Sequence, residues 1–225
     1  SVATDGDLTN VALGGGDDLL MLGAARAAGV YAGGTGLDSL MFTATTPVTL
    51  AGVVTGFEQI ALAGGSLTVA GSLGGTGETI AFADGNKLLA IAAGGRVTGT
   101  IDLGNGNDRL RLAETGVLAG TARGGAGIDT IIFEQAGTRS ILADQFTGFE
   151  RLQTEGLGTL ALASGSFVYE RVDATGALSI ARQASLLTRD VVFNQGDNQL
   201  TIDGGFIGSV DGGAGTDRIT VSGGS

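Results

Sequence analysis

Aspartates that recur inside a glycine-rich pattern of nine residues are the side chains of this sequence best suited to chemistry. The pattern, Gly-Gly-x-Gly-x-Asp-x-apolar-x, is intact at residues 33–41, 124–132 and 212–220. Its glycines allow positive φ angles that turn backbone carbonyls into a loop, and its Asp adds a carboxylate. Calcium takes about six to eight oxygen ligands from carboxylates and carbonyls. The pattern therefore predicts calcium binding.

Each intact copy follows a degenerate copy in which the first glycine is replaced, at residues 13–19, 103–109 and 193–199. The Asp or Asn positions of the two copies are separated by roughly twenty residues, a length that suits one coil of a solenoid. The two loops should then stack and sandwich an ion. The candidate ligands are Asp17, Asp18 and Asp38 at the first site, Asn107, Asp108 and Asp129 at the second, and Asp197, Asn198 and Asp217 at the third.

The third site should be the weakest, because Asn198 stands where the other pairs have Asp and fewer charges lower the affinity for calcium. A second interpretation stays open for all three sites. Gly-Asp and Asn-Gly pairs also form turns, in which the Asx side chain bonds to nearby backbone.

Three further features resemble sites but favour structural roles. Glu58 and Glu150 recur in a Gly-Phe-Glu sequence, and each follows a Phe that should pack inside. We therefore expect these two glutamates to order a coil corner by hydrogen bonding rather than to catalyse a reaction. The stretch 74–79 imitates the pattern but has Thr in place of Asp, which predicts a plain turn.

The landmarks recur with a long period. Gly16, Gly106 and Gly196 are each separated by 90 residues (106 − 16 and 196 − 106). We interpret residues 1–225 as a single solenoid segment, whose repeats span residues 13–102, 103–192 and, in part, 193–225. The third repeat stops before the Gly-Phe-Glu landmark, so we expect a segment of a longer protein with capping repeats elsewhere.

The composition predicts an all-β chain, because 43 glycines and one proline imply frequent tight turns between short strands. Apolar residues alternate with period two after nearly every glycine cluster, which indicates strands with one buried face. The same turn sequence recurs with the same polarity, which favours coils over hairpins. We predict a right-handed parallel β-helix, or β-solenoid, with stacked glycine-rich turns. Residues 167–192 are poorer in glycine and leave a short helix or an insertion open. The alternating pairs are Leu20 and Leu22, Leu40 and Phe42, Ile60 and Leu62, Leu67 and Val69, Ile80 and Phe82, Leu110 and Leu112, Ile131 and Phe133, Leu160 and Leu162, Leu200 and Ile202, and Ile219 and Val221.

Charge and residue usage exclude several functions. The formal net charge of −11 disfavours nucleic acid and anionic membranes as partners. No apolar stretch approaches the roughly 18 residues of a membrane span, and residues 1–10 lack the features of a signal peptide. The chain has no His or Cys, which removes the usual general base, thiol nucleophile and zinc site. Asp17 and Asp18 could in principle serve glycoside chemistry, but we predict a protein that is not an enzyme.

The three nonapeptides resemble those of the repeats-in-toxin (RTX) proteins, which bacteria export and which fold as a β-roll with extracellular calcium. Residues 54–69, 146–162 and 97–104 resemble the β-solenoid passenger regions of bacterial autotransporters of the alphaproteobacterial type, and the repetitive parts of surface-layer proteins. These resemblances imply a secreted or cell-surface bacterial β-helix.

We therefore expect a non-catalytic structural or adhesive segment of a large exported bacterial surface protein, stabilised by calcium. Its alternatives are a surface-layer-like self-assembling module and a non-catalytic accessory module of a secreted carbohydrate-active enzyme. Expected partners are calcium ions, a host surface or polysaccharide, and other copies of the chain, end to end or in a lattice, since exposed coil ends present unpaired strand edges. We expect no nucleic acid partner and no membrane insertion by this segment.

Overall fold

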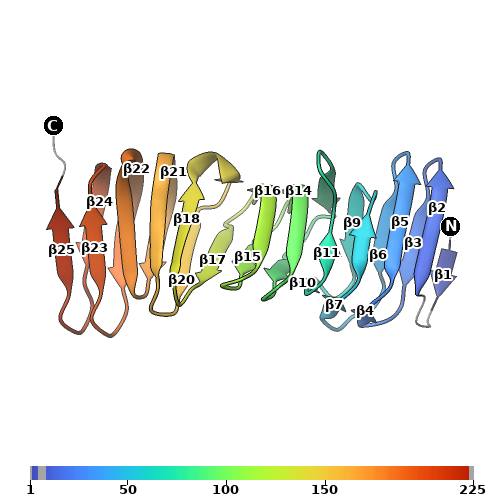
Figure 1. Ribbon diagram of the computed structural model, residues 1–225, viewed down its shortest axis with the longest axis horizontal. Coiled ribbons are helices and arrows are strands. Elements are labelled where there is room, and N and C mark those ends of the chain that lie inside the picture. Colours follow the sequence, from blue (N-terminus) through green and yellow to red (C-terminus); the bar gives the residue numbers. More distant parts are fainter. Residues whose placement is uncertain (1, 5–8, 223–225) are drawn as a thin grey trace. The chain divides into compact units, whose positions relative to one another are not determined.

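The computed structural model describes residues 2–4 and 9–222 and divides the chain into two compact units, Ser1–Gly127 and Ile128–Ser225 (Figure 1). Each unit is a stack of coils built from parallel strands, and the only helical element among the described residues is the 3-10 turn η1 (Ala143–Gln145). The predicted fold class, an all-β parallel β-solenoid with stacked glycine-rich turns, is confirmed. The boundaries of the predicted long repeats stay a prediction.

Unit 1 repeats three strand positions along its stack. Its strands are β1 (Val2–Thr4), β2 (Asn10–Gly15), β3 (Leu19–Leu22), β4 (Arg26–Ala27), β5 (Val30–Thr35), β6 (Ser39–Phe42), β7 (Val48–Leu50), β8 (Val53–Thr55), β9 (Gln59–Leu62), β10 (Ser66–Val69), β11 (Ser72–Leu73), β12 (Thr79–Phe82), β13 (Leu88–Ile91), β14 (Arg96–Asp102), β15 (Arg109–Leu112) and β16 (Val117–Arg123).

Parallel pairing in unit 1 joins each strand to its equivalent one coil later. One column runs β1, β3, β6, β9, β12. A second runs β2, β5, β8, β11, and a third runs β4, β7, β10, β13, β15. The longer strand β14 pairs with both β11 and β12, and β16 pairs with β14 one coil later.

Register places like side chains on top of one another in the core. Leu20 pairs with Leu40, and Leu40 pairs with Ile60; all three are at most 1% exposed. Fully burying such a side chain stabilises the fold by roughly 1.5–3 kcal/mol relative to leaving it exposed. The period-two alternation of the sequence therefore becomes continuous apolar columns inside the coils.

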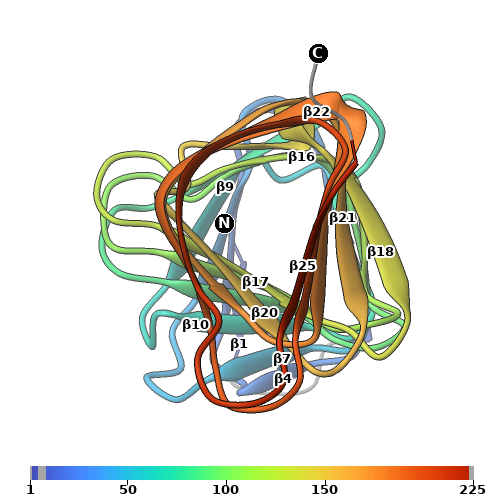
Figure 2. The same ribbon diagram turned by 90° about the vertical axis from the view of Figure 1, so that its left-hand side faces the viewer.

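Unit 2 contains two much longer strands. Its strands are β17 (Thr130–Glu134), β18 (Thr138–Leu142), β19 (Phe146–Thr147), β20 (Arg151–Glu155), β21 (Thr159–Ala174), β22 (Ala177–Phe193), β23 (Gln199–Ile202), β24 (Gly205–Asp211) and β25 (Arg218–Val221). In Figure 2 the coils at the front, which include β22 and β25, trace a loop around the interior of this unit.

The helix or insertion left open for residues 167–192 is not formed, because β21 and β22 cover this region except for the turn between them. Its buried residues follow period two, as in Phe167 and Tyr169, and the two strands pair along most of their length with one register shift.

The burial expected for the last alternating pair is also wrong. Ile219 and Val221 in β25 are 54% and 66% exposed, and the described partner of β25 is β23, on one side only.

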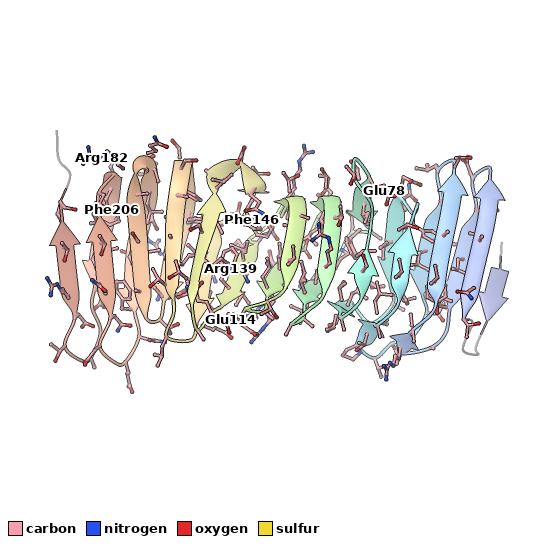
Figure 3. All side chains as sticks on the ribbon, viewed as in Figure 1. Glu78, Glu114, Arg139, Phe146, Arg182 and Phe206 are labelled. Carbon is pink, nitrogen blue, oxygen red and sulfur yellow. The ribbon has the colours of Figure 1, made fainter. Side chains whose placement is uncertain are left out.

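Two aromatic rings pack against each other in unit 2 near η1. The rings of Phe133 and Phe146 meet edge to face, with centroids 5.4 Å apart, and the Arg139 guanidinium lies 5.7 Å from the Phe133 centroid. Figure 3 marks Phe146 and Arg139 in this region. Among the described residues, no helix is long and apolar enough to span a membrane.

Candidate cation-binding turns

The turns that carry Asp18 and Asp38 stack on each other, as predicted from their spacing. Leu19 pairs with Ser39 directly after the two turns. The amide N–H of Asp18 donates to Oδ1 of Asp38 at 2.8 Å, and the amide N–H of Asp38 donates to Oε2 of Glu58 at 2.8 Å. We name such a series the inner ladder: a side chain in one coil accepts the amide N–H of the equivalent residue in the coil before.

The inner ladder recurs at the other turns. Lys87 N–H donates to Asp108 Oδ1 at 2.7 Å, Asp129 N–H to Glu150 Oε2 at 2.8 Å, and Asn198 N–H to Asp217 Oδ1 at 3.0 Å. Hydrogen bonds to charged groups contribute about 1.5–3 kcal/mol each. The role expected for Glu58 and Glu150, hydrogen bonding at a coil corner, is confirmed, and Phe57 and Phe149 before them are buried.

An outer ladder runs beside the inner one and in the opposite direction. Asp17 Oδ1 accepts the amide N–H of Leu37, one coil later, at 2.9 Å. Asp197 does the same for Thr216 at 2.8 Å. Asn86 Oδ1 likewise accepts the amide N–H of Asn107, one coil later, at 2.8 Å. The side chains of this outer ladder are exposed, so the stacked turns that carry it are tied on both their inner and their outer side.

The glycines of the pattern bring the backbones of neighbouring coils into contact. Gly34 has φ of +115°, and a Cβ added there would lie 1.8 Å from the carbonyl oxygen of Gly14. A Cβ on Gly125 would lie equally close, at 1.8 Å, to the carbonyl oxygen of Gly104. Coil stacking therefore explains why these positions are glycine. The turn expected at residues 74–79 is also formed, with Glu78 N–H bonded to the Gly75 carbonyl.

Asp38 is a candidate ligand with an unsatisfied oxygen. Its side chain is 0% exposed, and its Oδ2 has no hydrogen-bond partner within the described part of the chain. Burial of a carboxylate oxygen without a donor is costly. A cation beside Oδ2 would satisfy this oxygen.

The Asn198 turn satisfies its interior without a metal ion. The side-chain Nδ2 of Asn198 donates to the carbonyl of Gly196 at 2.7 Å and to that of Asn194 at 3.0 Å. Its Oδ1 accepts the amide N–H of Gly176 at 3.1 Å. The carbonyl of Gly196, two positions earlier, thus points toward the side chain of Asn198, and the Asn198 amide group donates a hydrogen bond to it.

Calcium fits these turns unequally. At Asp38 a buried, unsatisfied carboxylate oxygen suits a hard cation. At Asn198 the amide nitrogen faces the carbonyls and the amide oxygen is engaged, so this side chain offers a metal ion less than the Asp38 carboxylate does. Residues 2–4 and 9–222 contain no group of three or more acidic side chains that could hold a metal, so backbone carbonyls and water would supply most ligands at Asp38. Calcium at the nine predicted residues stays a prediction.

Asp108 and Asp129 of the predicted second site are both 0% exposed, and they belong to different units. Burial raises the pKa of Asp108, and the hydrogen bond from the Lys87 amide and the charge of Lys87 oppose that rise.

No protein-family model, curated protein or solved structure matches this chain. The geometry of the turns therefore carries the functional argument.

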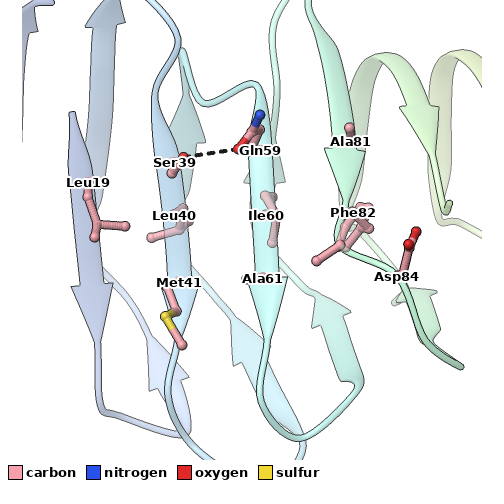
Figure 4. Close-up of a pocket in the computed structure, with 11 residues that line it drawn as sticks. Leu19, Ser39, Leu40, Met41, Gln59, Ile60, Ala61, Ala81, Phe82 and Asp84 are labelled. Carbon is pink, nitrogen blue, oxygen red and sulfur yellow. Dashed lines mark hydrogen bonds between the residues drawn. The ribbon is translucent and has the colours of Figure 1, made fainter. Parts of the chain in front are cut away.

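Each unit contains a hollow. The larger, about 420 Å³, crosses β3, β6, β9 and β12 in unit 1 (Figure 4). Mainly apolar side chains line it, and its polar groups are Ser39, bonded to Gln59 at 3.3 Å, and Asp84. The smaller, about 190 Å³, lies in unit 2 beside Phe146, Phe149, Phe167 and Tyr169. All four aromatic side chains are at most 6% exposed.

Sequence reasoning missed the turn formed by Asp84, Asn86 and Lys87. Asp84 Oδ1 accepts the amide N–H of Asn105 at 3.1 Å. Its signal was present, because Gly85-Asn86-Lys87 precedes Gly106-Asn107-Asp108 by one coil with the same Gly-Asn order. Lys in place of Asp concealed it.

Proposed function

We propose that this chain is a non-catalytic structural or adhesive segment of a large exported bacterial surface protein, with calcium stabilising its glycine-aspartate turns. The main support is the use made of the acidic side chains. The inner and outer ladders employ carboxylates such as Asp38 and Asp17 to bind amides of neighbouring coils. Their work is to hold coils in register, as a rigid spacer requires. The secreted or cell-surface location follows from the resemblance of the nonapeptides to exported proteins.

A catalytic role for the acidic pair Asp17 and Asp18 has little support from the geometry. Asp17 is exposed and its Oδ1 is bound to the Leu37 amide. Asp18 presents its backbone N–H to Asp38. Both residues are thus part of the coil-to-coil contact rather than of a separate site.

Calcium titration of chelator-treated protein, followed by calorimetry, tests the proposal. We expect saturable binding that loses one site in Asp38→Ala, where the unsatisfied oxygen is removed, and one in Asp129→Ala. Asp144→Ala, which removes an exposed carboxylate in η1 away from the ladders, is the matched control. If no calcium binds and the melting curve is unchanged by calcium, the nonapeptides form turns without a metal ion and the solenoid is stable without calcium.

A surface-layer-like, self-associating module is the second candidate, because unit 2 exposes an aliphatic stripe. Val168 pairs with Leu187, and Leu187 pairs with Ile207, on β21, β22 and β24. These side chains are 62%, 46% and 69% exposed, and exposed apolar patches often mark contact surfaces. Sedimentation at rising concentration tests this candidate: we expect self-association in the parent chain that Leu187→Lys abolishes. A monomer at all concentrations would eliminate it.

The accessory module of a carbohydrate-active enzyme receives no such support. Sugar-binding grooves present aromatic faces to solvent, whereas the aromatic side chains around the unit 2 hollow are buried.

A further inference from the structure

Lys87 is the only lysine of the chain, and it is 6% exposed. Lysine is almost never buried unless it is paired, so the position requires an explanation. Its Nζ donates to the carbonyl oxygen of Gly85 at 2.5 Å. This carbonyl belongs to a glycine with φ of +107°, in the turn between β12 and β13.

Lys87 occupies the Asp position of the glycine-aspartate turn. Its amide N–H donates to Asp108 Oδ1 in the inner ladder, and Leu88 pairs with Arg109 directly afterwards. Asn86 and Asn107 pair in the outer ladder beside it. The Lys87 turn is therefore built like the Asp turns, with a cationic side chain where they have an anionic one.

Lys87 and Asn198 bind equivalent carbonyls, each in its own turn. Each donor side chain reaches the carbonyl of the glycine two residues earlier, Gly85 for Lys87 and Gly196 for Asn198. Asp38 stands at the same place in its turn but supplies only acceptors, and its Oδ2 remains without a partner in the described structure. The turn thus provides a position for a donor or a cation.

We propose that the ammonium group of Lys87 is a built-in cation that takes the place a metal ion would take in this turn. Unit 1 would then combine a stack at Asp38 that responds to a free cation with a stack at Lys87 that needs none. The first half of this statement rests on the proposed calcium function, and the second half does not. Hydrogen bonds from Asn105 lower the pKa of the neighbouring Asp84, and the charge of Lys87 adds a smaller contribution in the same direction.

Melting in chelator tests the built-in cation without any use of calcium. Lys87→Met keeps most of the length of the side chain but removes its charge, and we expect the melting temperature to fall by about 5 °C or more. Arg109→Met, which removes one positive charge at an exposed position of the next coil, is the matched control and should change it little. Equal melting of the two variants would overturn the proposal.

Lys87→Asp tests whether the position accepts a metal ion. We expect this variant to bind one calcium ion more than the parent chain and to recover its melting temperature when calcium is added, whereas Lys87→Met recovers nothing. A Lys87→Asp variant that gains no calcium would overturn the equivalence of ammonium and metal. A parent chain that binds no calcium, together with a destabilised Lys87→Met, would instead refute the calcium function and leave the role of Lys87 intact.

Amine labelling of the unaltered protein provides a test that survives misfolding of the variants. Because Lys87 is the only lysine, mass spectrometry of its peptide reports one site. An ammonium bound in the turn should react with an amine-selective acylating reagent at least about tenfold more slowly in the native protein than in urea, since reaction requires local opening. Equal rates would overturn the proposal.

Discussion

The Asp38 turn and the Lys87 turn of unit 1 share one backbone design but differ in the charge at its centre. Both side chains are buried, and in both turns the glycine two residues earlier has a positive φ, +137° at Gly36 and +107° at Gly85. Lys87 binds the Gly85 carbonyl, whereas Asp38 adds a carboxylate oxygen with no partner among the described residues.

The difference shows that stacking and cation binding are separate properties of the turn. Amide-to-side-chain bonds such as Asp18 to Asp38 and Lys87 to Asp108 form in both stacks. The two turns differ in the side chain at the central position, Asp38 or Lys87. We expect only the turn with Asp38 to need a free cation.

Substituting a glycine where the backbones of two coils touch should change the free energy of unfolding the most. Gly34→Ala places a Cβ 1.8 Å from the Gly14 carbonyl, whereas Gly14→Ala, at a similar φ, meets nothing within 4 Å. We expect Gly14→Ala to lower the free energy of unfolding by about 1–2 kcal/mol through backbone strain, and Gly34→Ala by more than about 4 kcal/mol, because neighbouring coils must separate. Urea unfolding measures both. Equal losses would show that the coils do not touch at this turn.

Converting the Asn198 turn into an Asp38-like turn should have the next largest effect. Asn198→Asp replaces the donor that binds Gly196 and Asn194 with an acceptor. In chelator we expect a loss of about 2 kcal/mol, since buried carbonyls lose their partner. The same urea experiment measures the loss, and Asp197→Asn, an exposed change of one charge in the same turn, is the control. A stability unchanged by Asn198→Asp would contradict the need for a donor.

The reverse change at Asp38 should have a smaller effect of opposite sign. Asp38→Asn retains an oxygen for the Asp18 amide and supplies a donor in place of the unsatisfied Oδ2. We expect about 1 kcal/mol of added stability in chelator, because a buried unpaired charge disappears. Thermal melting in chelator measures the gain, and the gain should vanish in saturating calcium if a metal ion satisfies Asp38. Destabilisation in chelator would argue that Asp38 is satisfied without a cation.

The smallest effect concerns the exposed Asp84 in the Lys87 turn. Hydrogen bonds from Asn105, and then the charge of Lys87, hold the pKa of Asp84 below its ordinary value. The stability it contributes is therefore present above pH 3.8 and is lost as the pH falls through its lowered folded pKa. Carboxyl NMR titration should show a larger rise of this pKa in Asn105→Ala than in Lys87→Met. The opposite order would make the ammonium the main cause.

Much of the fold follows from local patterns in the sequence. Alternation such as Leu40 and Phe42 predicts a strand with one buried face, and glycine spacing predicts turns that repeat once per coil. These signals are reliable because period-two alternation and positive φ act within a few residues. The strands over residues 167–192 were harder to predict, because a glycine-poor stretch has few turn signals and only pairing with a neighbouring coil selects strand over helix.

The sequence by itself determined the coil length, the apolar columns and the places where the chain must turn. It also determined which residues stand at the turns, Asp38 and Lys87 among them. Only the tertiary structure decided what these side chains do there: Asp38 binds an amide one coil away, and Lys87 fills the position that Asn198 fills in another turn. The reason is physical, because these contacts join residues about one coil apart, and the register of stacking sets which atoms meet.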